Sequence, residues 1–167
     1  FRKSIFVISK KIRIMFSSSE ISDIKKLLSP DKNIVIITHH NPDGDAIGSS
    51  LGLKNFLKNK GIESTVLVPN YFPKFLKWMP NSKEVVIAEY KRKKAGEAIY
   101  NADIIFCLDF NNVARIGILG EWLTKSWAKK ILIDHHQQPE NFDFVYSDTE
   151  VPATSQMVYQ FIEALGE

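Results

Sequence analysis

The stretch that decides the fold is Ile34-Val35-Ile36-Ile37-Thr38, followed at once by His39-His40-Asn41-Pro42-Asp43-Gly44-Asp45. Consecutive β-branched residues, nearly all apolar, predict a strand that is buried on both faces. The polar segment 39–45 then marks the carboxyl end of that strand. A helical stretch over 46–61 follows, and Gly61 suits the left-handed conformation found just past a helix end. The segment therefore predicts a strand–loop–helix unit with polar groups at the strand's end.

The same alternation of short apolar runs and helical stretches continues along the chain. Further strands are predicted at 64–69, 84–88, 103–109 and 130–134, and further helices at 90–101, 116–127 and 154–165, with a short amphipathic helix ahead of Pro30. Apolar strands separated by helices are typical of a parallel sheet covered on both faces. We therefore expect a three-layer α/β fold, Rossmann-like and doubly wound, with a mostly parallel sheet of about five strands.

Composition excludes several classes of protein. The chain has 167 residues, of which 44% are hydrophobic and 25% charged, which fits one folded domain and excludes disorder. Cys107 is the single cysteine, so a disulfide scaffold and a thiolate zinc site are excluded and a cytoplasmic location is favoured. No apolar run approaches the roughly 20 residues of a membrane span, so no membrane partner is expected.

The net charge of +3 comes from one end of the chain. Residues 1–14 carry five of the 22 basic residues and no acidic residue, and without them 17 basic residues face 19 acidic ones, a net of −2. We expect residues 1–14 to be an extension outside the fold and residues 15–167 to form the domain. The apparent basicity is then weak evidence for nucleic-acid binding.

Histidines and aspartates gather at three predicted strand ends. The four histidines form two pairs, His39-His40 and His135-His136, and aspartates accompany both pairs, while Asp109 ends a third strand. Because the carboxyl ends of parallel strands meet at one edge, these groups should converge. Crowded carboxylates need cations, and oxygen and imidazole donors without sulfur suit Mn²⁺ or Mg²⁺, with Zn²⁺ or Fe²⁺ as alternatives. We expect two ions bridged by Asp109; an Asp-Gly turn and a helix N-cap at Asp109 are the structural alternatives.

Other residues near these strand ends have a functional and a structural interpretation. Ser49 lies at the start of a predicted helix, where free amides could face a phosphate, although close packing explains the small residues equally well. Arg115 could bind a substrate phosphate or form a surface ion pair. The basic run over 91–94 is interpreted as a solvated helix face, with a nucleic-acid-binding patch as the alternative.

Two further predictions concern packing. Four aromatic residues are expected to pack against the sheet rather than stack on bases: Tyr71, Phe72, Phe75 and Trp78. Thr154 and Ser155 are expected to cap the last helix.

The strand-end motifs resemble those of the DHH phosphoesterase superfamily: His39-x-x-x-Asp43-x-Asp45, the strand-end Asp109 and Asp134-His135-His136, in a match from about residue 20 to the C-terminus. The nearest likeness is to the branch of bifunctional oligoribonuclease/pAp phosphatases, the nanoRNases. The resemblance implies that His39, Asp43 and Asp109 hold one Mn²⁺, and that Asp45, Asp109 and His135 hold the other. It also implies that His136 contacts the scissile phosphate or assists proton transfer, and that Asp134 orients the imidazoles.

The resemblance implies a two-metal phosphoesterase that attacks short RNA or 3'-phosphoadenosine 5'-phosphate with a metal-activated hydroxide. A homodimer is compatible with it. A non-catalytic nucleotide-binding domain, an inorganic pyrophosphatase and a single-strand exonuclease remain as alternatives.

Two features of the family pattern are missing. A fourth metal-binding aspartate and a C-terminal substrate domain have no counterpart, and Asp148, 12 residues after His136, is interpreted as a loop or capping residue. We therefore expect the N-terminal catalytic domain to be incomplete, to bind metal weakly and to hydrolyse little substrate on its own.

Overall fold

A computed structural model describes residues 16–166, which form a six-stranded sheet with all strands parallel, in the order β3-β2-β1-β4-β5-β6. The strands are β1 (Ile34–Thr38), β2 (Ser64–Val68), β3 (Val86–Ile87), β4 (Ile104–Leu108), β5 (Lys129–Asp134) and β6 (Phe144–Ser147). The helices are α1 (Ser18–Leu27), α2 (Gly44–Asn59), α3 (Arg92–Tyr100), α4 (Leu119–Lys125) and α5 (Thr154–Ala164), and the 3₁₀ turns are η1 (Lys74–Leu76), η2 (Ser82–Glu84) and η3 (Val113–Ile116).

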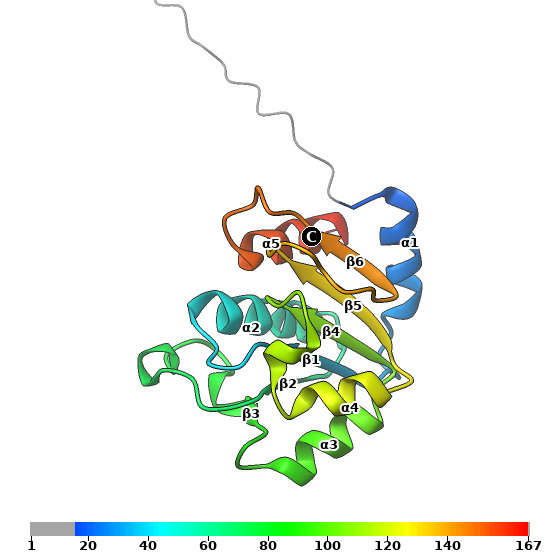
Figure 1. The fold of residues 1–167 in the computed structure, drawn as a ribbon. Coiled ribbons are helices and arrows are strands. Elements are labelled where there is room, and N and C mark those ends of the chain that lie inside the picture. The colour runs from blue at the N-terminus through cyan, green and yellow to red at the C-terminus, as the bar shows by residue number, and fades with distance from the viewer. Residues whose placement is uncertain (1–15, 167) are drawn as a thin grey trace, which may run out of the picture.

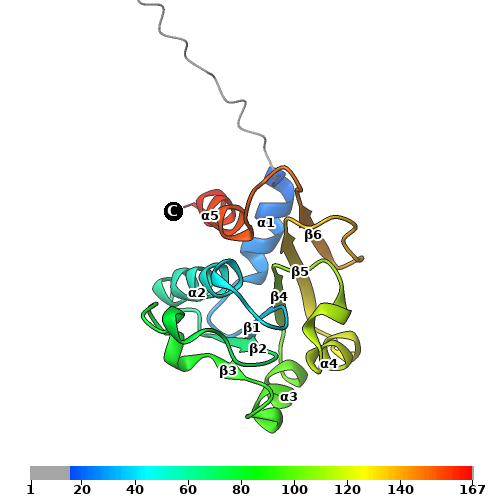
Figure 2. The ribbon, with the colours of Figure 1, turned by 60° about the vertical axis from the view of Figure 1, so that its left-hand side comes forward.

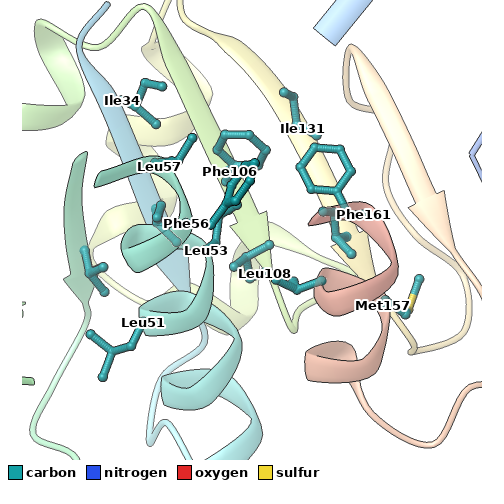
Figure 3. Close-up of a cluster of buried hydrophobic side chains, with 14 of the residues drawn as sticks. Ile34, Leu51, Leu53, Phe56, Leu57, Phe106, Leu108, Ile131, Met157 and Phe161 are labelled. Carbon is teal, nitrogen blue, oxygen red and sulfur yellow. The ribbon is translucent and has the colours of Figure 1, made fainter. Parts of the chain in front are cut away.

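Alternate residues of the inner strands point into two separate cores. Ile34 and Ile36 of β1 belong to the core that includes buried residues of α1, α2 and α5, whereas Val35 and Ile37 belong to the core with α3 and α4. Figures 1 and 2 show these two groups of helices on opposite faces of the sheet. In Figure 3, Phe106 of β4 and Phe161 of α5 lie in the first core. The predicted three-layer α/β fold is confirmed.

The strand order places a topological switch between β1 and β4. From β1 the chain moves outward through β2 to β3, then returns to β4 beside β1 and moves outward again through β5 to β6. In open α/β sheets of this kind, ligands bind at the carboxyl ends of the strands where the order reverses. His39 follows β1 and Asp109 follows β4, so both lie at the switch point.

The structure differs from the predicted elements at the sheet's edges. The sheet has a sixth strand, β6, whose only buried residue is Tyr146, so its sequence lacks the continuous apolar run of the inner strands. The strand expected over 84–88 is reduced to β3 because residues 82–84 form η2. The helix expected over 116–127 is divided, since Gly117 with a φ of 53° separates η3 from α4.

The prediction for the aromatic residues was wrong at two positions. Phe72 is buried, but Phe75 and Trp78 are 73% and 77% exposed. The cause is η1, which turns Leu76 inward and leaves its neighbours at the surface.

The first described residue, Phe16, already belongs to the folded unit. The extension expected over residues 1–14 lies outside the described residues. Phe16 packs in the core, with its ring centroid 4.5 Å from that of Tyr146. Of the helices between residues 16 and 166, none is long and apolar enough to cross a membrane.

Candidate metal centre

Asp109 lies at the centre of the polar groups at the carboxyl edge of the sheet. It follows β4 with a φ of 64°, in the left-handed region that aspartate tolerates better than most residues. The side chain is 2% exposed. Such a conformation in a buried residue costs free energy and is found mainly where the surrounding structure fixes a functional group.

The two carboxylate oxygens of Asp109 face different histidines. Oδ2 lies 3.5 Å from Nε2 of His39, which follows β1. Oδ1 lies 3.5 Å from Nε2 of His135, which follows β5. Because β1 and β5 are the two neighbours of β4 in the sheet, the three strand ends bring both histidines to the same carboxylate. The arrangement suits a carboxylate shared between two ions.

His39 and Asp43 complete the group on the β1 side. The ring of His39 is hydrogen-bonded through Nδ1 to the carbonyl oxygen of His40 at 2.9 Å, which leaves Nε2 facing Asp109. Nε2 lies 4.0 Å from Oδ1 of Asp43. Asp43 caps α2, since Oδ1 also accepts from the backbone amides of Asp45 and Ala46. The capping contacts hold the carboxylate in place at the mouth of the site.

His135 and His136 form the group on the β5 side. Nδ1 of His135 lies 3.3 Å from the carbonyl oxygen of Val151, so its Nε2 is again left for Asp109. Nδ1 of His136 lies 2.6 Å from Oδ1 of the fully buried Asp134, and the His136 amide donates to Oδ2 of the same carboxylate. Asp134 therefore fixes the ring of His136 and leaves its Nε2 for another partner.

Neighbouring groups shift the pKa values of Asp109 and His39. Burial alone would raise the pKa of the Asp109 carboxyl, but hydrogen bonds from His39 and Thr154 and the charge of the nearby imidazoles hold the pKa below its usual range. Burial alone would lower the pKa of His39, but hydrogen bonds with Asp109 and the His40 carbonyl raise it above its usual range. A histidine and a carboxylate that stabilise each other's charges in this way can exchange a proton for a cation.

Asp45 makes hydrogen bonds that the sequence did not indicate. Its two carboxylate oxygens accept from the backbone amides of Thr154 and Ser155, at 2.7 and 2.8 Å. The carboxylate therefore caps α5, whose own N-cap residue, Ala153, has no side-chain acceptor. Thr154 and Ser155 are not capping residues, and that prediction was wrong. A ligand role for Asp45 stays a prediction.

Thr154 is the site residue that the sequence did not indicate. It is fully buried, and its hydroxyl donates to Oδ1 of Asp109 at 3.0 Å. In the sequence it is one threonine in a helix start, without any signal that it reaches a strand end 45 residues earlier.

The remaining predicted residues lie around the site without joining it. Ser49 is buried and its hydroxyl donates to the Ala46 carbonyl. Arg115 makes no ion pair within residues 16–166, and its carbonyl accepts from the His40 amide at 2.7 Å. Substrate binding by Ser49 and Arg115 stays a prediction. Asp148 accepts from the Glu150 amide, as expected of a loop residue.

The residues that do converge fit divalent metal. Two groups of three have ligand atoms within 4.8 Å of one another, and both contain Asp109: His39, Asp43 and Asp109, and Asp109, His135 and His136. Imidazole and carboxylate donors without thiolate suit Mn²⁺ and related ions. The Nδ1 atoms of His39 and His135 face backbone carbonyls, as in many metal-ligating histidines.

Comparisons with known proteins identify the family of the chain and relatives that share its fold. The family described as "DHH family, N-terminal domain" matches residues 33–167. The bifunctional oligoribonuclease and PAP phosphatase NrnA of Thermus thermophilus is 34% identical over 135 residues, which are 80% of this chain and 37% of that protein. The chain thus spans well under half of this curated relative.

Two solved structures share the fold. An exopolyphosphatase-related protein from Bacteroides fragilis has a TM-score of 0.87 and 41% identity over 90% of this chain and 44% of its own. RecJ in complex with Mn²⁺ from Thermus thermophilus has a TM-score of 0.54 and 14% identity over 89% of this chain and 20% of its own, a likeness in fold alone.

Proposed function

Because this chain belongs to the DHH family, we propose that it is the catalytic domain of a metal-dependent phosphoesterase that hydrolyses short oligoribonucleotides or 3'-phosphoadenosine 5'-phosphate. The single observation that carries the proposal is Asp109, whose two oxygens each lie 3.5 Å from a different histidine. A buried carboxylate between two imidazoles supplies the oxygen and nitrogen donors that divalent cations bind. The substrate class rests on the name of the Thermus thermophilus relative.

His39, Asp43 and Asp109 would hold one divalent cation, Mn²⁺ or Mg²⁺, and Asp109 and His135, with Asp45 as the resemblance implies, would hold the other. When bound, the two cations would neutralise phosphate charge and activate a water molecule for attack in line with the leaving oxygen.

The chain's own groups would position the substrate. Asp134 holds Nδ1 of His136, so that Nε2 of His136 is free to contact a phosphate oxygen or to pass a proton to the leaving oxygen. Arg115 follows Asp109 by six residues, and its guanidinium can bind a phosphate through two parallel hydrogen bonds. We place the protein in the cytoplasm, where the buried Cys107 stays reduced.

Release of mononucleotide from a five-residue oligoribonucleotide, and of phosphate from 3'-phosphoadenosine 5'-phosphate, tests the proposal. We expect weak activity with Mn²⁺, none with EDTA, and a loss of at least about 10²-fold in Asp109→Ala because both cations lose a shared ligand. Asp23→Ala is the matched control, since Asp23 is an exposed residue of α1 that pairs with Lys26. Activity that survives Asp109→Ala would contradict the shared-ligand role, and pyrophosphate as the preferred substrate would contradict the substrate class.

One observation favours a second function, a nucleotide-binding domain without turnover. Both oxygens of Asp45 accept hydrogen bonds from α5. If these contacts persist with metal present, the second cation lacks one of its expected ligands. Binding of 3'-phosphoadenosine 5'-phosphate without hydrolysis at saturating Mn²⁺ would then be observed.

A further inference from the structure

Three large aromatic side chains lie exposed in the connection from β2 to α3, which the proposed chemistry does not use. Phe75 is 73% exposed, Trp78 77% and Tyr90 69%. Large aromatic side chains exposed within one connection indicate a binding surface. Lysines are interleaved with them in the chain, and we define the aromatic–lysine surface by six residues: Phe75, Trp78, Tyr90, Lys77, Lys83 and Lys91.

The lysines of this surface have no carboxylate partner within the described residues. By contrast, Lys93 pairs with Glu97 on α3, and the buried Lys54 pairs with Glu84 at 3.2 Å. Glu84 is thus turned away from Lys83, its neighbour in the chain. Lys77 lies over the ring of Tyr71, 5.1 Å from its centroid. Unpaired lysines beside aromatic rings are typical of surfaces that bind polyanions with planar groups.

A pocket of about 320 Å³ is lined by four of the six residues of the aromatic–lysine surface, while Phe75 and Trp78 lie outside its lining. Lys77, Lys83, Lys91 and Tyr90 line it together with the apolar side chains of Phe72, Val85 and Ile87, and no acidic residue is among the lining residues. The exposed Glu89 lies next to Tyr90 in the chain but does not line the pocket. The positive charge and the apolar lining of this pocket together fit a nucleotide base and its phosphate.

The aromatic–lysine surface is joined to the metal centre. Asn70, which follows β2, accepts from the backbone amide of Asn41 at 2.7 Å and donates to its side chain at 2.6 Å. Asn41 belongs to the loop between His39 and Asp43. Tyr90 and Lys91 follow β3, at the same carboxyl edge of the parallel sheet as His39 after β1. Since β3 is two strands from β1, the carboxyl ends of these two strands are separated by a distance on the order of 10 Å.

We infer that the aromatic–lysine surface binds the part of a single-stranded oligonucleotide that extends away from the scissile phosphate. Bases stack on Phe75, Trp78 and Tyr90, and phosphates contact Lys77, Lys83 and Lys91. This inference rests on the proposed function, because it takes the metal centre as the place of cleavage. A protein partner fits less well, since lysine is depleted at protein–protein interfaces.

Binding of a fluorescent five-residue oligouridylate in EDTA tests the surface without any hydrolysis. We expect Phe75→Ala/Trp78→Ala to weaken binding at least about tenfold, since one stacked base contributes a factor of about 5 to 150. We expect Lys83→Ala/Lys91→Ala to reduce the slope of log affinity against log salt by about 1.4, the value for two phosphate contacts to a single strand. All four side chains lie at the surface, so circular dichroism melting should match that of the unmodified protein.

Two matched controls lie near the amino ends of the strands. Trp127→Ala removes a fully exposed tryptophan that precedes β5, and Lys58→Ala/Lys94→Ala removes two exposed lysines without ion pairs within residues 16–166. Neither should change binding. The inference would be overturned if these control variants weakened oligonucleotide binding as much as the aromatic and lysine variants do. It would also be overturned if the aromatic and lysine variants left oligonucleotide binding unchanged. The inference would also be overturned if the protein formed a dimer that Trp78→Ala dissociates while oligonucleotide binding stays unchanged.

Kinetics with Mn²⁺ separate this inference from the proposed function. Trp78→Ala should raise KM for the five-residue oligoribonucleotide and leave hydrolysis of 3'-phosphoadenosine 5'-phosphate unchanged. If neither compound is hydrolysed but Trp78→Ala still weakens oligonucleotide binding, the proposed function is wrong and the binding role of the surface is supported. If the unmodified protein and Trp78→Ala hydrolyse both compounds with the same KM values, only the inference about the surface is wrong.

Discussion

Thr154 donates a hydrogen bond to the carboxylate of Asp109 from a position 45 residues later in the chain. Thr154→Val keeps the shape of the side chain and removes the donor to a buried carboxylate. We expect a loss of about 1.5–3 kcal/mol in the free energy of unfolding without metal, and about 10- to 100-fold weaker Mn²⁺ binding because Asp109 is less well oriented. Urea denaturation and calorimetric titration measure the two effects. Thr154→Ser, which retains the hydroxyl, should restore most of both; equal behaviour of the two variants would exclude the positioning role.

At the scale of elements, Asp143 connects the outer strand pair, β5 and β6. Its carboxylate pairs with Lys129 at 2.8 Å and accepts from the Lys130 amide. Burial raises the pKa of Asp143, but these two contacts outweigh it and hold the pKa below its usual range. A depressed pKa in the folded state gives stability above the unfolded pKa of about 3.9, and that stability is lost as the pH falls through the folded value.

Asp143→Asn should therefore be less stable than the unmodified protein by about 1 kcal/mol or less at pH 7. The difference should stay constant down to about pH 5 and shrink below about pH 4, where the native carboxyl becomes protonated. Urea denaturation between pH 3 and pH 7 measures it. A difference that grew as the pH fell would show that the carboxylate destabilises the folded state.

Elements with continuous apolar runs could be predicted from the sequence, and those that depend on distant partners could not. The run Ile34–Thr38 is apolar at nearly every position because β1 lies in the middle of the sheet, with helices on both faces. The edge strand β6 lacks such a run. His39, Asp109 and His135 were predicted to meet because parallel strand ends share an edge. The contact of Asp45 with α5 spans 109 residues and depends on how that helix packs, which no local pattern encodes.

At the scale of the whole molecule, cation binding should link the two halves of the sheet, since Asp109 lies between histidines from β1 and β5. A ligand at 100 times its Kd stabilises the folded state by about 2.7 kcal/mol, which corresponds to a Tm increase of about 5–11 °C for a domain of this size. Thermal melts with increasing Mn²⁺ should reach that shift, and EDTA should reverse it. His39→Ala and His135→Ala should each remove part of it and Asp109→Ala all of it. Because Ca²⁺ prefers oxygen to imidazole, it should give a smaller shift at equal concentration. An equal shift with Ca²⁺, or one that persists in Asp109→Ala, would place the cation among surface carboxylates instead of at the strand ends.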